Sequence, residues 1–508
     1  MEAIEKERIA QKTKERKICV VIPVFNCEST IGRVVRKTLE LCHDVIVVDD
    51  GSRDKTPEVL KEYSDKITLI THKKNKGKGA ALKDGLRLAR KNGFAYAITL
   101  DSDGQHYPSD ISTFVEENIG HPDRIIVGKR IDSTRKRRSS IIANKISNFW
   151  FAVQTGRHLH DTQSGFRLYP LRHLPIWAMT KRFEAELLLL VLSYWNGVHV
   201  REVKIDVYYP PKDEQTSHFR PVRDFARITL LNTILCVLTL VYGLPVRILR
   251  SLRNFLRSFY SLIAFLLYTL LVVKPFTWIY TLTHKKHVHG QKHTLHNFIY
   301  KTARLVMVKH GIPGVKFSSK VCEGVDFNKP SIIICNHQSA LDLFCAMIFT
   351  PKVVFIVNDR VWKNPFYGKL IRKAGYLQAS LGLRKLMPQI KSRIEHGYSV
   401  AIFPEGTRSV NGKIGRFHRG AFQIASVLGV DIIPLYLYGA GRAFPKGAWY
   451  IRRAQIYIEA GSSITQEQLS HCQNFMEQAS YVRKLYKERC SAIANRIDIE
   501  NHSIKTGK

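Results

Sequence analysis

The first part of the chain alternates short apolar runs with amphipathic stretches. Runs such as KICVVIPV and DVIVVDD have the length of buried strands, and apolar residues recur at helical spacing between them. Strands that alternate with helices form parallel sheets with helices on their faces. We therefore predict an α/β domain over residues 17–225, which follows a charged tail at residues 1–16.

The same alternation returns in the last part of the chain. From about Ser331 the apolar runs SIIICN, VVFIVN and SVAIFPEG are again separated by helical stretches. A chain of 508 residues is too long for one hydrophobic core, so a division into two domains is expected. Residues 284–508 are predicted to form a second α/β domain.

The segment between these domains is strongly apolar. No charged residue occurs from Ile228 to Val246, a stretch that as a helix is about 28 Å long at 1.5 Å per residue. A second apolar stretch runs from Ser258 to Val273. We predict that residues 226–283 form apolar helices that anchor the protein in a membrane. A pair of buried helices in a soluble protein is the alternative.

Four arginines lie between the two apolar stretches, at positions 247, 250, 253 and 257. If both stretches crossed the bilayer, this basic loop would lie on the far side, against the tendency of basic loops to stay in the cytoplasm. We therefore predict a monotopic or re-entrant anchor on the cytoplasmic face of the cell (inner) membrane.

The overall charge favours an anionic partner. The 79 Lys and Arg residues outnumber the 42 Asp and Glu residues, and the net charge of +37 would attract acidic headgroups, phosphorylated substrates or nucleic acid. No nucleic-acid-binding module is recognisable, so we expect no nucleic acid partner. Nine cysteines without a C-x-x-C pair are typical of reduced thiols in the cytosol.

Acidic side chains follow two strands of the first predicted domain. Asp49 and Asp50 end the run DVIVVDD, and Asp101 and Asp103 follow the run AYAITL. Ligands of doubly wound sheets bind at the carboxyl ends of strands. Two carboxylates at i and i+2 can offer oxygen ligands to a divalent cation, which can stabilise a diphosphate leaving group.

Five motifs in this region together resemble family 2 glycosyltransferases of the GT-A (Rossmann-like) fold, particularly the synthases of dolichyl-phosphate and polyprenyl-phosphate sugars. The motifs are IPVFN, VVDDGSRDKT, NKGKGAALKDGLRLA, LDSDGQHYPSDI and DTQSGFRLYP. The resemblance implies a nucleotide-sugar donor, a lipid acceptor, and Mg²⁺ or Mn²⁺ held by Asp101 and Asp103. It differs from the family pattern at Asn26, which is followed by Cys27 before Glu28.

This resemblance also implies roles for single residues. The implied residues are Pro23, Asp49, Asp50 and Asp101 for the nucleotide-sugar, Arg130, Arg138 and Arg167 for the acceptor, and Asp161 for catalysis. For Arg130 and Arg138, the first and last residues of the basic stretch RIDSTRKRR, a membrane-facing basic loop is the alternative interpretation.

The second predicted domain carries a different chemistry. His337 follows the run SIIICN, and Asp342 comes five residues later. A hydroxyl that attacks a thioester must lose its proton, for which a neutral imidazole is a suitable base. A nearby aspartate can orient the ring and stabilise its protonated form. We predict His337 and Asp342 as a catalytic pair.

A second motif, FPEGTRS, also follows an apolar run. With NHQSALD and IIPLYLYG it resembles glycerolipid acyltransferases of the lysophosphatidate acyltransferase type. The resemblance implies an acyl-CoA or acyl-carrier-protein donor and an acceptor site formed by Glu405, Gly406, Thr407 and Arg408. Such enzymes typically have a phosphate-binding arginine in a middle motif, where this chain has Leu381, with Arg384 three residues later.

The two resemblances predict a bifunctional, membrane-associated transferase. It would transfer a sugar and an acyl chain to lipid-type acceptors, as in the synthesis of glycolipids or pigment lipids. The alternative is a polyprenyl-phosphate glycosyltransferase joined to an independent lysophosphatidate acyltransferase of phospholipid synthesis.

Overall fold

The computed structural model describes residues 2–131, 138–182, 184–208, 221–283, 292–409, 412, 414–448 and 450–503. It separates into two compact units. Unit 1 comprises Met1–Arg250 and Ala494–Lys508, and unit 2 comprises Ser251–Ile493. Each unit is built on its own seven-stranded sheet, which confirms the predicted pair of α/β domains.

The sheet of unit 1 has the strand order β3-β2-β1-β4-β6-β5-β7. Its strands are parallel except β6, which is antiparallel to both β4 and β5. The strands are β1 (Ile18–Val24), β2 (Val45–Asp49), β3 (Thr68–Thr71), β4 (Tyr96–Thr99), β5 (Arg124–Arg130), β6 (Arg167–Pro170) and β7 (His199–Ile205).

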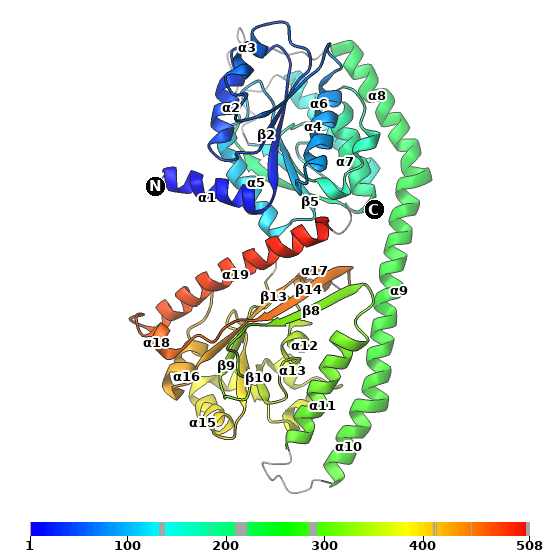
Figure 1. The fold of residues 1–508 in the computed structure, drawn as a ribbon. Coiled ribbons are helices and arrows are strands. Elements are labelled where there is room, and N and C mark those ends of the chain that lie inside the picture. Colours follow the sequence, from blue (N-terminus) through cyan, green and yellow to red (C-terminus); the bar gives the residue numbers. More distant parts are fainter. Residues whose placement is uncertain are drawn as a thin grey trace. The chain divides into compact units, whose positions relative to one another are not determined.

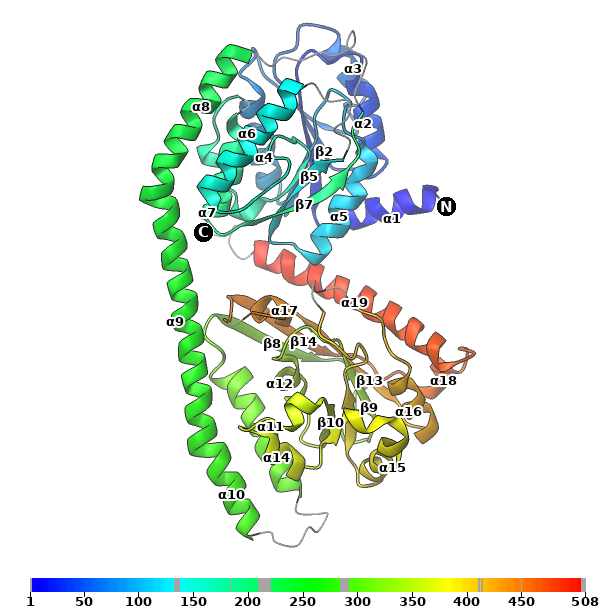
Figure 2. The ribbon, with the colours of Figure 1, turned by 180° about the vertical axis from the view of Figure 1, so that it is seen from behind.

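Helices cover both faces of this sheet (Figures 1 and 2). The helices are α1 (Glu2–Glu15), α2 (Ile31–Leu39), α3 (Thr56–Lys61), α4 (Lys78–Lys91), η1 (Pro108–Asp110), α5 (Ile111–Gly120), α6 (Arg138–Thr155), η2 (Leu171–His173), η3 (Ile176–Ala178), α7 (Glu184–Trp195) and α8 (Pro221–Leu238). Alternate residues of β1 enter opposite cores. Cys19 and Val21 pack toward α4 and α7, whereas Val20 and Ile22 pack toward α2 and α5. This alternation is why the strands read as continuous apolar runs.

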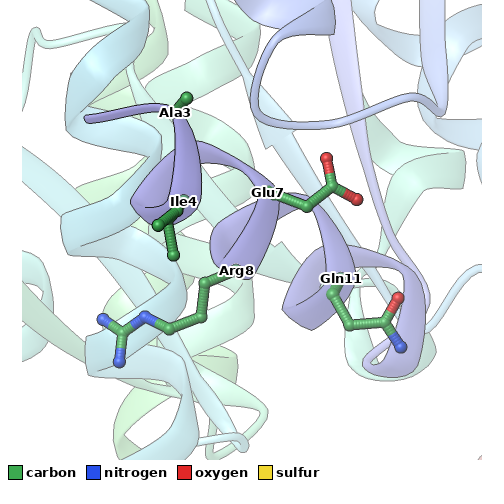
Figure 3. A pocket seen from close by; sticks show the side chains of 5 residues that line it. All are labelled: Ala3, Ile4, Glu7, Arg8 and Gln11. Atoms are coloured by element: carbon green, nitrogen blue, oxygen red, sulfur yellow. The ribbon is translucent and has the colours of Figure 1, made fainter. Parts of the chain in front are cut away.

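The charged N-terminal segment forms helix α1. Ile9 and Ala10 are buried in it, and the Arg16 side chain just after it donates a hydrogen bond to Asn118 Oδ1 at 2.7 Å. The opposite side of α1 carries a shallow hollow (Figure 3), lined by Ala3, Ile4, Glu7, Arg8 and Gln11. None of these residues belongs to a predicted site.

The sheet of unit 2 has the order β11-β10-β12-β9-β13-β14-β8. Its first five strands are parallel, and β14 is antiparallel to β13. The strands are β8 (Val315–Val321), β9 (Ile332–Cys335), β10 (Val353–Val357), β11 (Leu377–Gln378), β12 (Ser399–Ile402), β13 (Ile432–Tyr438) and β14 (Ala454–Ala460).

Most of the remaining helices belong to unit 2. They are α9 (Leu244–Tyr268), α10 (Lys274–Thr283), α11 (Lys292–Arg304), η8 (Leu305–Lys309), α12 (Asp342–Ala346), α13 (Asp359–Trp362), α14 (Gly368–Lys373), η9 (Ala379–Leu381), α15 (Gly382–Glu395), α16 (Gly420–Leu428), α17 (Ala440–Ala443), α18 (Gln466–Leu469) and α19 (Phe475–Ser503). The first residues of α9 and the last residues of α19 are counted with unit 1. Tyr486 of α19 donates a hydrogen bond to the Ile334 carbonyl at 2.7 Å, behind the strand that ends at His337.

The two predicted apolar stretches belong to one continuous helix. Among the described residues, Arg227–Thr283 is a 57-residue helix that is long and apolar enough to cross a membrane. Only 17% of its most apolar window is buried, so it is not an ordinary core helix. Two π-helical turns, η5 (Thr239–Gly243) and η6 (Thr269–Val273), interrupt its α-helical geometry. The chain does not reverse between the two stretches, as a re-entrant hairpin would require.

The first two arginines between the apolar stretches contact the protein. Arg250 Nη2 donates a hydrogen bond to the Trp195 carbonyl at 2.7 Å, at the end of α7. The Arg247 guanidinium lies against Gly156, which follows α6, and a Cβ at that glycine would come within 2.9 Å of Nη2. Basic groups are favourable at helix C-termini, where carbonyls lack helical partners. These two arginines therefore lie on a helix against unit 1, and not in a loop as predicted.

Candidate active sites

The predicted nucleotide-sugar residues lie at the carboxyl ends of β1 and β2. Pro23 is beside Val48 in the parallel register, and Asp49 accepts a hydrogen bond from the Ser52 backbone at 2.9 Å. Both carboxylate oxygens of Asp50 already have hydrogen-bond partners within the protein. It accepts from the backbone N–H groups of Lys76 and Gly77 at 2.8 and 2.7 Å.

A buried histidine completes the surroundings of Asp50. His72 Nδ1 lies 2.7 Å from Asp50 Oδ1, and its Nε2 lies 3.2 Å from Asp84 Oδ2. Asp50 thus fixes the loop that leads into α4, which carries Lys78 at its first position. This arrangement indicates that Asp50 holds the loop before α4 in place. For the predicted contact with the donor, its oxygens would have to accept hydrogen bonds from the donor as well as from the loop and His72.

The two predicted metal ligands follow β4. Asp101 is paired with Lys78, whose Nζ lies 2.7 Å from Asp101 Oδ1 and 3.5 Å from Glu186 Oε2. Burial would lower the pKa of Lys78, but the two carboxylates outweigh it and raise that pKa. Burial and the neighbouring Asp101 carboxylate raise the pKa of Asp103 to about 6.

The Asp101 and Asp103 pair fits a shared cation. Two half-buried carboxylates two residues apart repel each other, and a divalent ion would relieve that repulsion. Gly165 leaves the room that Asp101 needs, because a Cβ at that position would come within 2.5 Å of Asp101 Oδ2. The described residues contain no cluster of three or more His, Cys, Asp or Glu side chains suited to a metal. The remaining ligands would therefore come from elsewhere, such as a bound diphosphate.

The structure brings Arg130 and Asp161 together. Arg130 Nε and Nη2 donate to the two oxygens of Asp161 at 2.6 and 2.7 Å, a bidentate pair in which Asp161 is buried. The Asp161 backbone N–H in turn donates to Glu202. The side chain of Arg138, the first residue of α6, lies outside the described residues.

Arg167 has no exposed surface. Its guanidinium donates to the carbonyls of Thr162, Ser164 and Glu186 at 2.7 to 2.9 Å, and to the hydroxyl of Tyr169 at 3.1 Å. These bonds hold the DTQSG loop against α7. The arrangement indicates a supporting role, and direct contact with an acceptor stays a prediction.

In unit 2, His337 and Asp342 meet as predicted from their spacing. His337 Nδ1 lies 2.8 Å from Asp342 Oδ2, and Asp342 is fully buried. The same oxygen accepts from the backbone N–H groups of Gln338 and Ser339 at 2.5 and 2.8 Å. Burial raises the pKa of Asp342, against the opposing effect of these hydrogen bonds. Phe403 stacks on the imidazole with ring centroids 4.4 Å apart, which fixes the plane of the ring.

The FPEGTRS motif follows β12, beside the end of β9. Glu405 Oε1 accepts from the His337 backbone at 2.8 Å, and Oε2 accepts from the Gly415 backbone at 2.7 Å. Glu405 is therefore occupied in joining two loops, while Gly406 and Thr407 are exposed and Arg408 is half-buried. The structure thus brings the histidine and the whole motif to one edge of the sheet.

An acidic residue from another segment, Asp359 at the start of α13, is hydrogen-bonded to the middle motif. Asp359 Oδ1 accepts from Gln378 Nε2 at 2.9 Å and from Ser380 Oγ at 2.7 Å. Leu381, in the place of the expected arginine, is 39% exposed. Because β10, β11, β12 and β9 are parallel neighbours, these polar groups share a sheet edge with His337.

Comparison with known proteins assigns both halves of the chain. The glycosyl transferase family 2 model matches residues 19–175. A UDP-N-acetylglucosamine:dolichyl-phosphate N-acetylglucosaminyltransferase of Methanococcus voltae is 30% identical over 218 residues, which cover 38% of this chain and 87% of that protein. The chain belongs to glycosyl transferase family 2. This confirms the prediction made from the five motifs.

The C-terminal part of this family 2 glycosyltransferase is an acyltransferase domain, matched by the acyltransferase model over residues 312–438. The chloroplast 1-acyl-sn-glycerol-3-phosphate acyltransferase LPAT1 of Arabidopsis thaliana is 26% identical over 193 residues, 36% of this chain, and the chain spans half of that protein's length. The crystal structure of the acyltransferase PlsC from Thermotoga maritima superimposes with a TM-score of 0.42 and 21% identity, covering 48% of this chain and 97% of that one.

Sequence reasoning missed three residues that shape these sites. Lys78 belongs to the quoted motif NKGKG. The acidic Asp101 needs a positive partner nearby, and this need was the signal that could have pointed to Lys78. Phe403 belongs to the quoted motif FPEGTRS, but its contact with His337 joins distant segments. His72 had no such signal, because its contact with Asp50 also joins segments that lie apart in the sequence. The roles of all predicted site residues remain predictions that mutation must test.

Proposed function

We propose that this protein is a bifunctional, membrane-associated transferase that moves a sugar from a nucleotide-sugar and an acyl chain from acyl-CoA or acyl-carrier protein onto lipid-type acceptors. The observation that carries the proposal is the presence of two separate reactive arrangements in one chain. Asp101 and Asp103 follow a strand of one sheet, and the His337–Asp342 pair follows a strand of the other.

At the first site, Asp101 and Asp103 would hold Mg²⁺ or Mn²⁺, which when bound stabilises the negative charge of a diphosphate leaving group. Asp49 and Pro23 lie where the nucleoside of the donor would bind. Lys78 supplies a second positive charge beside Asp101. Arg130, oriented by Asp161, would then face the phosphate of a lipid acceptor.

At the second site, His337 acts as the general base. Its Nδ1–H donates to Asp342, which leaves Nε2 to take a proton from the acceptor hydroxyl. The hydroxyl oxygen then attacks the thioester carbonyl, and the protonated imidazole returns its proton to the leaving thiolate. Buried Asp342 stabilises the imidazolium, and stacked Phe403 keeps the ring in its plane.

The acyl acceptor is proposed to be a neutral or glycosylated lipid. Leu381 provides no phosphate contact, and Asp359 adds a negative charge close by, held by Gln378 and Ser380. Amide, hydroxyl and carboxylate groups of this kind can hydrogen-bond a sugar. One observation favours the alternative, a lysophosphatidate acyltransferase: Arg408 is half-buried and pairs with no carboxylate among the described residues, so it can meet a phosphate.

The cytoplasmic face of the cell membrane is the proposed location. Both donors are cytosolic compounds, and the mostly exposed apolar helix Arg227–Thr283 supplies a membrane contact. At 57 residues it is nearly three times as long as the roughly 20 residues of a single crossing, so we favour a helix that lies in the membrane surface.

Lipid mass spectrometry can test the proposal in cells that express the wild type, Asp101→Ala or His337→Ala. A sequential reaction predicts that both variants lose a lipid with sugar and acyl chain, and that His337→Ala accumulates the lipid with sugar alone. Independent reactions predict that each variant loses one product and accumulates nothing from the other. If both variants retain every lipid of the wild type, the proposed function is wrong.

A further inference from the structure

A basic cluster in unit 2 lies where α9 passes the segment that precedes β14. Arg253 and Arg257 belong to α9, and Arg453 belongs to that segment. The segment is tied to the helix because the Ile451 backbone N–H donates to Ser258 Oγ at 2.7 Å. Burial and the charges of Arg253 and Arg453 lower the pKa of Arg257. No carboxylate offsets that repulsion among the described residues.

Arg257 is the innermost member of this cluster. Its Nη1 is buried and has no hydrogen-bond partner among the described residues. The guanidinium lies against Gly314, where a Cβ would come within 2.7 Å of Nη1. By contrast, Arg250 three residues before Arg253 donates to a carbonyl of unit 1. An unpaired cationic N–H that has lost its water costs free energy, so an anionic ligand would stabilise it.

The surroundings of the cluster on α9 are apolar and exposed. Leu252, Phe255, Leu256 and Phe259 have exposed fractions from 44% to 55%. At about 100° per residue these side chains form one stripe. Arg253 lies next to the stripe, and Arg257 lies further round the helix, on the side that faces Gly314. Helices that lie in a membrane surface have this arrangement, with apolar side chains among the acyl chains and basic groups at the level of the phosphates.

We propose that Arg253, Arg257 and Arg453 bind the phosphate of an anionic phospholipid headgroup, while the adjacent stripe of α9 enters the acyl region. The inference rests on the membrane association included in the proposed function. A soluble phosphate compound would offer the same charge, but the exposed stripe beside the cluster favours a bilayer as the source. The site would set the depth and orientation of α9 in the membrane surface.

Vesicle binding by the full-length protein tests this site. The double variant Arg257→Gln/Arg453→Gln is compared with Lys385→Gln/Lys391→Gln, which removes the same charge from exposed positions of α15. On vesicles of phosphatidylcholine with phosphatidylglycerol we expect the first pair to weaken binding about thirtyfold, because each basic group near an anionic surface contributes about fivefold. The control pair should change it little, and binding to pure phosphatidylcholine should be equal for all.

Equal losses in both double variants would overturn the proposal, because the net charge of +37 would then explain the attraction. The proposal also fails if inorganic phosphate raises the thermal stability of the wild type but not of the Arg257→Gln/Arg453→Gln variant, while vesicle binding is unchanged. If the wild type binds neither kind of vesicle, membrane association itself is wrong. Should Arg257→Gln fail to fold, exposed Arg453→Gln alone should still weaken binding about fivefold.

Discussion

At the glycosyltransferase site Asp101 and Asp161 pair with long basic side chains, whereas Asp342 and Glu405 at the acyltransferase site accept from backbone N–H groups. In unit 1, Lys78 binds Asp101 and Arg130 binds Asp161. Long basic side chains can exchange partners without any change in the backbone. This site can therefore rearrange its charges when a cation and a diphosphate bind.

In unit 2 the carboxylates are fixed. Asp342 accepts from two backbone N–H groups in addition to His337, and both oxygens of Glu405 accept from the backbone of different loops. A proton transfer requires a base in a fixed position and tautomer. From this comparison we expect a preorganised acyltransferase site, and a glycosyltransferase site whose ion pairs rearrange when charged ligands bind.

The largest effect is expected at the preorganised site. His337→Ala should lower acyl transfer by about 10² to 10⁴ fold, because the general base is lost. Sugar transfer should stay at the wild-type rate, since no residue of the first site changes. Both activities are measured on one purified preparation with radiolabelled donors. A matching fall in sugar transfer would show that the two sites depend on each other.

Metal removal should have the opposite selectivity, lowering sugar transfer and leaving acyl transfer unchanged. EDTA, or Asp101→Ala, should lower sugar transfer by about 10² to 10³ fold, because the developing charge on the diphosphate loses its main stabilising group. Thioester consumption should not change. Full sugar transfer in EDTA would exclude the metal role of Asp101 and Asp103, and restoration by Mn²⁺ should occur in the wild type only.

A substitution of buried Arg167 tests whether this residue of the DTQSGFRLYP motif binds the acceptor or stabilises the fold. Arg167→Ala should destabilise unit 1 by about 3 to 5 kcal/mol, because several buried acceptors lose their donor. Hydrogen exchange of β6 peptides in the full chain measures this, with Arg36→Ala on the exposed side of α2 as the control. Unchanged exchange, together with weaker use of the lipid acceptor, would instead support direct acceptor binding.

The fold of both halves was predictable because strands buried on both faces appear as continuous apolar runs, as in KICVVIPV and SIIICN. The pairing of His337 with Asp342 was also predictable, since the two residues are five positions apart in the short segment that follows β9. Local patterns of this kind are read directly from spacing.

Contacts between distant segments were not predictable. Whether Asp50 faces a ligand or the backbone of Gly77 depends on how a loop 27 residues later folds back. Arg167 occurs in a signature that suggests acceptor binding, but three carbonyls and a hydroxyl from its surroundings enclose it. The continuity of the helix over both apolar stretches was missed as well. The arginines suggested a loop, but two of them lie against glycines or carbonyls of unit 1.

The smallest expected effect concerns the choice of acyl acceptor, and it depends on the fixed geometry of the second site. Leu381→Arg should raise the use of lysophosphatidate relative to a glycosylated lipid by about tenfold, because it adds one charge-assisted contact to phosphate. Asp359 lies near this position, where it accepts hydrogen bonds from Gln378 and Ser380. It will therefore neutralise part of the positive charge of the new arginine. The measured quantity is the ratio of kcat/KM for the two acceptors, with Leu381→Gln as a polar but uncharged control. If the wild type already forms phosphatidate efficiently through His337, and Leu381→Arg does not change the ratio, then Arg384 or Arg408 supplies the phosphate contact and the acceptor is lysophosphatidate.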